Sequence, residues 1–244
     1  MLIFRLMVVA AAALAGCAST NNTDLKIKDR GVFVPSARAS LDISPHAESP
    51  SVPHSGHGIE IGFSGASSDD TQSLAAGEPS IVFGGRTFTS PNELRHEFDW
   101  RFAELAYRYR NFFGERRNFG IEALGGLGYA QLDLSVASPT QRASEKLSNG
   151  GLIGGFGLLF KIRPTTSLQS RFTLFLSGEN EDVSVATRFD AYLVQAIGKN
   201  MAARIGAAGW NLESSREVGS TFTSPNSRIR ASFSGFGLGL DVMF

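Results

Sequence analysis

The 244-residue sequence lacks the features by which several classes of protein are recognised. Its single cysteine, Cys17, excludes a disulfide framework and a metal site built from several cysteines. Its 23 basic and 23 acidic residues balance, whereas nucleic-acid binding needs clustered lysine and arginine. Its apolar runs are too short for a transmembrane helix, which needs about 20 residues. Nucleic acid is therefore not expected as a partner, and a membrane span would have to be made of strands.

Residues with catalytic or metal-binding chemistry are also scarce. Of the four histidines, only His96 lies near the outer end of an expected strand, and that strand has no serine at two-residue spacing from it. A nucleophile needs its base within about 3 Å, so only a serine from a neighbouring strand is left open. We interpret His96 as an interfacial side chain beside aromatic residues. The sequence predicts no metal site, no cofactor and no catalytic residue.

The C-terminal segment 236–244 shows what the chain does contain. Every second residue from Phe236 to Phe244 is large and apolar, and the residues between them are glycine, aspartate or methionine. Alternate side chains of a strand point to opposite faces. The segment therefore predicts a strand with one apolar face, as in a membrane barrel where that face meets lipid.

The same alternation recurs seven more times before this segment. We expect strands over 58–64, 93–111, 118–136, 150–163, 167–177, 183–197 and 201–212, with the last strand ending at Phe244. In the second of these, the apolar face changes after Ala103 and Glu104, which predicts a β-bulge. Long and short connections alternate, as in outer-membrane barrels with tight periplasmic turns. The fold class predicted is all-β: an eight-stranded, antiparallel, up-and-down transmembrane β-barrel with both chain ends in the periplasm.

The direction in which the charged residues point follows from the free-energy cost of placing a charge in lipid. An arginine on the lipid face at mid-bilayer costs about 2–4 kcal/mol, so the charged residues of the strands should face the lumen. An eight-stranded barrel is only wide enough for side chains to fill it. We expect a closed lumen with glycines making room for ion pairs, and a narrow channel as the alternative. The predicted network consists of Glu60, Glu97, Asp99, Arg101, Glu122, Arg171, Arg188, Asp190, Arg204 and Asp241.

The start of the chain has the pattern of an export signal. A short apolar core ends in Leu14-Ala15-Gly16-Cys17, which resembles the bacterial lipobox, whose cysteine becomes the lipidated first residue. Ala18 after that cysteine implies sorting to the outer membrane. We therefore expect a signal peptide over 1–16, a lipidated flexible tether over 17–56 and a barrel over 57–244. The tether is polar and predicted to be disordered, although its apolar piece 31–35 could dock in the barrel mouth.

The strand pattern resembles that of the small outer-membrane barrels of the OmpA-transmembrane-domain and OmpX type, from which the lipobox and the long tether depart. The likeness covers roughly 57–244 and rests on strand alternation, loop rhythm and the terminal Phe244, the residue expected to serve membrane assembly. It implies outer-membrane lipid, lipopolysaccharide and the barrel-assembly machinery as partners. It also implies a structural or surface-interaction role, with a lipid A-modifying or acyl-hydrolysing enzyme as the alternative. The segment Thr-Phe-Thr-Ser-Pro-Asn, at 87–92 and 221–226, predicts two similar external turns or a paired binding surface.

Overall fold

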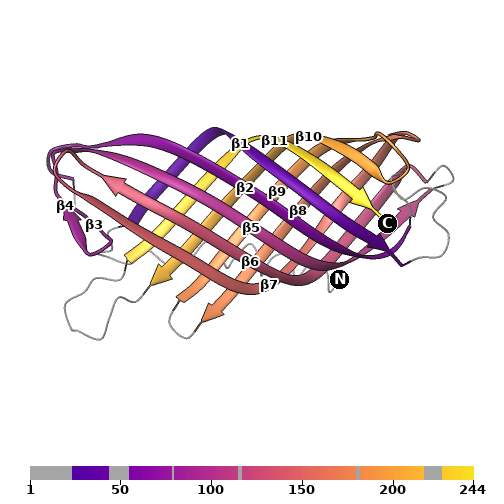
Figure 1. Ribbon diagram of the computed structural model, residues 1–244, viewed down its shortest axis with the longest axis horizontal. Helices are drawn as coiled ribbons and strands as arrows, with labels where there is room; N and C mark the ends of the chain where they lie inside the picture. Colours follow the sequence, from indigo (N-terminus) through magenta and orange to yellow (C-terminus); the bar gives the residue numbers. More distant parts are fainter. Residues whose placement is uncertain (1–23, 44–54, 79, 115–116, 180–181, 217–226) are drawn as a thin grey trace.

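The structure is a computed structural model that describes residues 24–43, 55–78, 80–114, 117–179, 182–216 and 227–244. The described chain is all-β, and nine long strands close into one barrel, with the order β1-β11-β10-β9-β8-β7-β6-β5-β2 (Figure 1). All neighbours are antiparallel except β1 and β11, which are parallel. The wall strands are β1 (Asp24–Asp42), β2 (Gly56–Leu74), β5 (Asn92–Phe113), β6 (Phe119–Ala137), β7 (Arg142–Arg163), β8 (Thr166–Glu179), β9 (Asp182–Ala196), β10 (Met201–Arg216) and β11 (Ser227–Met243).

The strand count of eight is wrong, and the ninth strand comes from the segment expected to be a tether. β1 pairs with β11 from Asp24 to Ser40 and with β2 over 36–42. A bulge at Gly31, whose φ is +80°, keeps the alternation in register. The polar composition of β1 concealed it, because its inward positions hold polar side chains such as Arg38 and Ser40.

The ninth strand also changes where the chain ends lie. Because β1 runs parallel to β11, Asp24 lies at the end of the barrel opposite Phe244. The inference that an even strand count puts both chain ends on one side is therefore wrong for the described chain. We call the end that holds Phe244 the C-terminal end, and the opposite one, which carries β3 (Ile81–Phe83) and β4 (Arg86–Phe88), the hairpin end (Figure 1).

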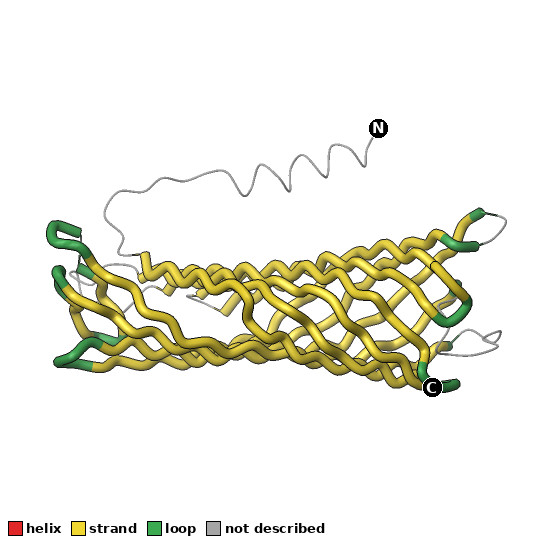
Figure 2. The backbone as a smooth tube through the Cα atoms, turned by 90° about the horizontal axis from the view of Figure 1, so that it is seen from above, coloured by secondary structure: helices red, strands yellow, loops and turns green. Residues whose placement is uncertain are grey.

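The strands are longer than the sequence indicated, up to 22 residues in β5 and β7. β2 continues to Leu74 and β7 already begins at Arg142, so segments expected to be loops extend the wall into a long tube (Figure 2). At the hairpin end, β3 and β4 fold inward: Phe83 and Phe88 are buried, and Gln141 donates to the carbonyl of Thr87 at 2.7 Å.

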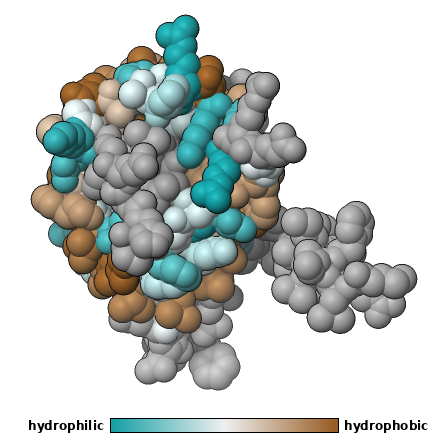
Figure 3. Space-filling view, turned by 90° about the vertical axis from the view of Figure 1, so that its right-hand side faces the viewer, coloured by the Kyte–Doolittle hydropathy of each residue, from teal (hydrophilic) through white to brown (hydrophobic). Residues whose placement is uncertain are grey.

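An apolar belt surrounds the half of the barrel next to the C-terminal end. On the outer face of β6 it extends from Phe119 to Tyr129, and on β11 from Phe236 to Phe244. Apolar side chains recur around the periphery when the barrel is seen from this end (Figure 3). Its larger members are Phe33, Leu41, Ile43, Ile59, Ile61, Phe63, Leu105, Tyr107, Tyr109, Phe113, Phe119, Ile121, Leu127, Tyr129, Leu152, Phe156, Leu158, Phe160, Ile162, Leu168, Leu176, Phe189, Leu193, Ile197, Met201, Ile205, Phe236, Leu238, Leu240 and Phe244.

In the other half, which we call the distal half, the pattern of the two faces is reversed. Its outer face is polar and its interior holds apolar side chains. On β5, the outward side chains change from charged to apolar between Arg101 and Ala103. At the same level, the inward side chains change from apolar to charged between Phe102 and Glu104. Buried interior residues of the distal half include Leu94, Phe98, Trp100, Phe102, Leu132, Leu134, Val136, Phe175, Trp210, Ile229 and Phe233.

This reversal replaces the β-bulge expected after Ala103 and Glu104. β5 pairs with β2 and β6 without a register shift through these residues. The wall has bulges instead between Arg30 and Val32 and between Lys161 and Arg163. The change of face in the sequence therefore reflects a change of surroundings along one continuous strand.

Candidate functional site

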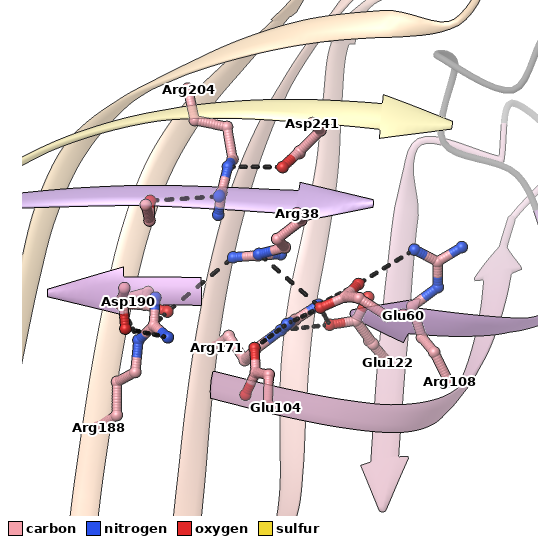
Figure 4. Close-up of polar contacts among 12 residues, drawn as sticks. Arg38, Glu60, Glu104, Arg108, Glu122, Arg171, Arg188, Asp190, Arg204 and Asp241 are labelled. Atoms are coloured by element: carbon pink, nitrogen blue, oxygen red, sulfur yellow. Dashed lines mark hydrogen bonds and ion pairs between the residues drawn. The ribbon is translucent and has the colours of Figure 1, made fainter. Parts of the chain in front are cut away.

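The interior of the belted half holds a network of charged side chains, which is the main candidate site (Figure 4). These side chains come from eight of the nine wall strands, and nearly all are buried. Alternation along each strand places them inward, since their neighbours form the belt. Six basic and six acidic residues balance: Arg38, Arg108, Arg110, Arg171, Arg188 and Arg204 with Asp42, Glu60, Glu104, Glu122, Asp190 and Asp241.

Arg171 lies at the centre of this network. Its guanidinium is 2.5 Å from a Glu60 carboxylate oxygen and 2.7 Å from one of Glu122. Glu60 also accepts a hydrogen bond from Arg108 at 3.2 Å and lies 3.8 Å from Arg38. Arg171 is on β8 and Glu60 on β2, which lie on opposite sides of the ring. These contacts therefore cross the lumen from wall to wall.

Two further pairs extend the network around the ring. Arg188 donates to Asp190 at 2.8 Å, and Asp190 lies 4.0 Å from Arg38. Arg204 lies 2.7 Å from Asp241 and donates to the Ser36 hydroxyl at 3.2 Å. Because Arg38 and Ser36 belong to β1, the ninth strand contributes directly to the polar interior.

Glycines on the inner face make room for these side chains. A β-carbon on Gly62 would lie 2.5 Å from a Glu104 oxygen, and one on Gly239 would lie 2.9 Å from the Arg204 guanidinium. The expectation that glycine provides lumen space agrees with these contacts at both positions. A side chain at either glycine would therefore displace a member of the network.

A second layer of packed side chains, which are mostly aromatic, lies in the interior of the distal half. The rings of Trp210 and Phe102 lie 4.8 Å apart, and those of Trp210 and Trp100 lie 5.2 Å apart. The Arg188 guanidinium lies 5.2 Å from the Trp210 ring centre, a cation–π geometry that joins the ionic layer to the aromatic one. A small cavity of about 40 Å³ lies beside Trp100 in this layer. The ionic layer and the aromatic layer thus lie one above the other in the tube.

The structure divides the ten residues of the predicted network into two groups. Glu97, Asp99 and Arg101 do not face the lumen. Arg101 pairs with Asp99 at 2.9 Å, with both side chains more than 40% exposed, and Glu97 pairs with Arg142 on the same outer surface. The expectation failed for them because it assumed lipid along the whole strand. The other seven lie inside: Glu60, Glu122, Arg171, Arg188, Asp190, Arg204 and Asp241.

Five members of the network were not predicted. Glu104, Arg108 and Arg110 alternate with Leu105, Tyr107 and Tyr109, so their inward direction was readable from the pattern. Arg38 and Asp42 carried no such signal, because they lie in the segment assigned to the tether.

The remaining residues singled out by the sequence have varied positions. His96 is buried in the distal interior, so it is not an outward-facing side chain as the interfacial interpretation required. Phe244 is exposed at the C-terminal end, where its backbone amide donates to the carbonyl of Ser40 at 2.9 Å. Of the repeated segment, the first copy places Phe88 in the apolar interior. The second copy, at 221–226, and Cys17 lie outside the described residues.

A scan against protein-family models, a search of curated proteins and a search of solved structures each found no match for this chain. These comparisons therefore do not support the likeness to the OmpA and OmpX type, and the structure shows the coarser feature, a closed all-β barrel of nine strands. Within the described ranges, no helix is long and apolar enough to cross a membrane, and no group of three or more histidine, cysteine, aspartate or glutamate residues is placed to hold a metal ion.

Proposed function

We propose that this protein is an outer-membrane β-barrel lipoprotein with a structural or surface-interaction role. The observation that carries the proposal is the apolar belt on the outer face, combined with the reversal of pattern where the belt ends. Large apolar patches are rare on the surface of soluble monomers, whereas a lipid-facing band of about 25 Å is typical of membrane barrels. The belt covers 11 residues of β6, from 119 to 129, close to the 9–11 residues with which a tilted strand spans a bilayer.

The reversal supports an arrangement in which only the belted half lies in the membrane. Above the belt, two successive rows of outward residues on β2, β5 and β6 lack large apolar side chains, as expected of a surface in water. The first row is Gly65, Arg101 and Gln131, and the second is Ser67, Asp99 and Asp133. The tight connections 164–165 and 197–200 lie at the C-terminal end, which corresponds to the periplasmic side of outer-membrane barrels. The distal half then extends outside the cell among lipopolysaccharide, after insertion by the barrel-assembly machinery through the C-terminal strand.

The doubly closed lumen favours an interaction role over conduction. Ion pairs cross the lumen from wall to wall in the belted half, and the buried rings of Trp100, Phe102 and Trp210 pack against one another in the distal half. The outer face of β5, β6 and β7 in the distal half has instead a shallow depression of about 520 Å³, lined by charges of both signs that include Glu97, Asp133 and Lys146. This surface is where we place contact with envelope components or an external ligand.

Three measurements test the proposal. The protein should fractionate with outer membranes, require detergent for extraction, and run at a different apparent mass on gels before and after heating. In planar bilayers it should give no steady unitary current; a reproducible current would favour the narrow channel. Lipid A mass spectra from cells with and without the gene should be identical, and a difference would favour the enzyme. A mature protein that is soluble without detergent would refute the membrane assignment.

A further inference from the structure

We propose that the lipid anchor at Cys17 inserts into the leaflet that faces the distal half of the barrel, which is the outer leaflet of the outer membrane. This inference rests on the proposed function. It concerns which side of the bilayer the N-terminus reaches, and it reverses the expectation that both chain ends are periplasmic.

The direction of β1 is the first observation. β1 and β11 are parallel along 24–40, with Phe33 opposite Phe236 and Ser40 opposite Met243. The strand therefore starts at the hairpin end and descends towards the C-terminal end. β1 is held on both edges where it crosses the belt, by β11 and by β2 over 36–42. Its buried Arg38 lies 3.8 Å from Glu60 and 4.0 Å from Asp190.

The height of Asp24 above the belt is the second observation. Phe33 is the first outward apolar residue of the described β1 side chains, and its neighbour on β11, Phe236, begins the belt there. Nine residues separate Asp24 from Phe33. At about 3.3 Å per residue and a strand tilt of about 40°, Asp24 lies roughly 23 Å beyond the edge of the belt.

The length of chain before Asp24 then decides between the leaflets. Cys17 lies seven positions before Asp24, and seven fully extended residue steps span at most about 25 Å. This is just enough to reach the near edge of the belt. The far edge lies a further 25 Å or so away, about twice the reach of the chain. An anchor in the inner leaflet would require β1 to leave the wall and its partners on β11, β2 and β9.

Cysteine labelling on intact cells tests this assignment. An acylated Cys17 has no free thiol, so the wild-type protein is the unlabelled control. Three variants each provide one thiol: Thr23→Cys before β1, Thr140→Cys in the turn at the hairpin end and Lys199→Cys in the turn at the C-terminal end. The probe is a membrane-impermeant maleimide, applied before and after permeabilisation.

We expect Thr23→Cys and Thr140→Cys to be labelled on intact cells, and Lys199→Cys to be labelled only after permeabilisation. Labelling of Thr140→Cys without labelling of Thr23→Cys would overturn the inference and leave the membrane barrel intact. Labelling of Lys199→Cys on intact cells would overturn both, because the barrel would then have the wrong orientation or would not span the membrane.

A disulfide test addresses the position of β1 independently. Ala37 and Leu240 are neighbours on the outer face of β1 and β11, and neighbouring strands lie within the range of α-carbon separations that a disulfide bridges. The double variant Ala37→Cys/Leu240→Cys should cross-link within one chain on mild oxidation. No cross-link would mean that β1 is outside the wall, and the inference would fail. The matched control pairs Ala37→Cys with Leu158→Cys on β7, which lies across the ring and should not cross-link.

Discussion

Replacing Arg171 by alanine tests the closed ionic lumen in the most quantitative way. The guanidinium of Arg171 lies within 2.8 Å of carboxylate oxygens on Glu60 and Glu122, and each of these three side chains is at most 5% exposed. Removing one partner of a buried ion pair costs about 3–5 kcal/mol, because a charge is left without compensation. We expect Arg171→Ala to lower the free energy of unfolding by about that amount, roughly a hundred- to several-thousand-fold in the folding equilibrium.

The matched control is Arg101→Ala. Arg101 also pairs with a carboxylate, that of Asp99 at 2.9 Å, but its side chain is 54% exposed on the distal outer face. Exposed pairs of this kind contribute about 0–1 kcal/mol, so the control variant should be nearly as stable as the wild type.

The assay is a denaturant titration in lipid vesicles, followed by tryptophan fluorescence. Trp100 and Trp210 are both buried in the distal interior and should report the loss of the native barrel. Equal effects of the two substitutions, or a larger effect of Arg101→Ala, would refute the division of the charged residues between lumen and outer surface.

Three further substitutions test other parts of the structure. Leu158→Arg, in the middle of the belt on β7, should cost about 2–4 kcal/mol in vesicles, whereas Ser148→Arg on the same outward row in the distal half should be neutral; equal costs would contradict the position of the belt. Gly237→Ala should cost about 1–3 kcal/mol by overpacking, since its new methyl group would overlap the hydroxyl of Tyr192, and a fully stable variant would contradict this contact. Phe88→Ala should make segment 75–91 sensitive to protease, because Phe88 belongs to the hairpin and its side chain is fully buried in the interior; unchanged resistance would show that Phe88 does not hold the hairpin.

The belted half was predictable from the sequence because two independent signals coincide there. Strict alternation gives the strand, and the cost of placing arginine in lipid gives the direction of each face. Arg171, Arg188 and Arg204 followed both signals, and the structure places them inside. Arg108 and Arg110 carry the same two signals and also lie inside.

The distal half was not predictable by that reasoning, because the rule for lipid was applied where the strand has left the belt. Residues Glu97 to Arg101 alternate as regularly as the residues of β5 in the belted half, and alternation alone does not show which face of the strand is exposed to water. The switch at Ala103 and Glu104 was the available signal. A strand of 22 residues is about twice what a bilayer requires, and that excess length is the physical reason for the switch.

β1 escaped prediction for a different reason. β1 obtains its backbone hydrogen bonds from β11 along 24–40 and also from β2 over 36–42, so it needs little apolar surface of its own. Pro35 points outward and Arg38 finds carboxylates in the lumen. The local composition of β1 indicates neither its backbone pairing nor the ion pairs of Arg38, since both depend on strands far away in the sequence.

The most direct test of the two-part barrel is a spin-label accessibility scan along the outward row of β5 in vesicles. Nitroxides at Leu105 and Tyr109 should be accessible to oxygen and protected from a polar nickel complex. Nitroxides at Arg95 and Asp99 should show the opposite preference, because this outer face lies in water. The same lipid exposure at all four positions, or none at any of them, would contradict a belt that ends between Arg101 and Ala103.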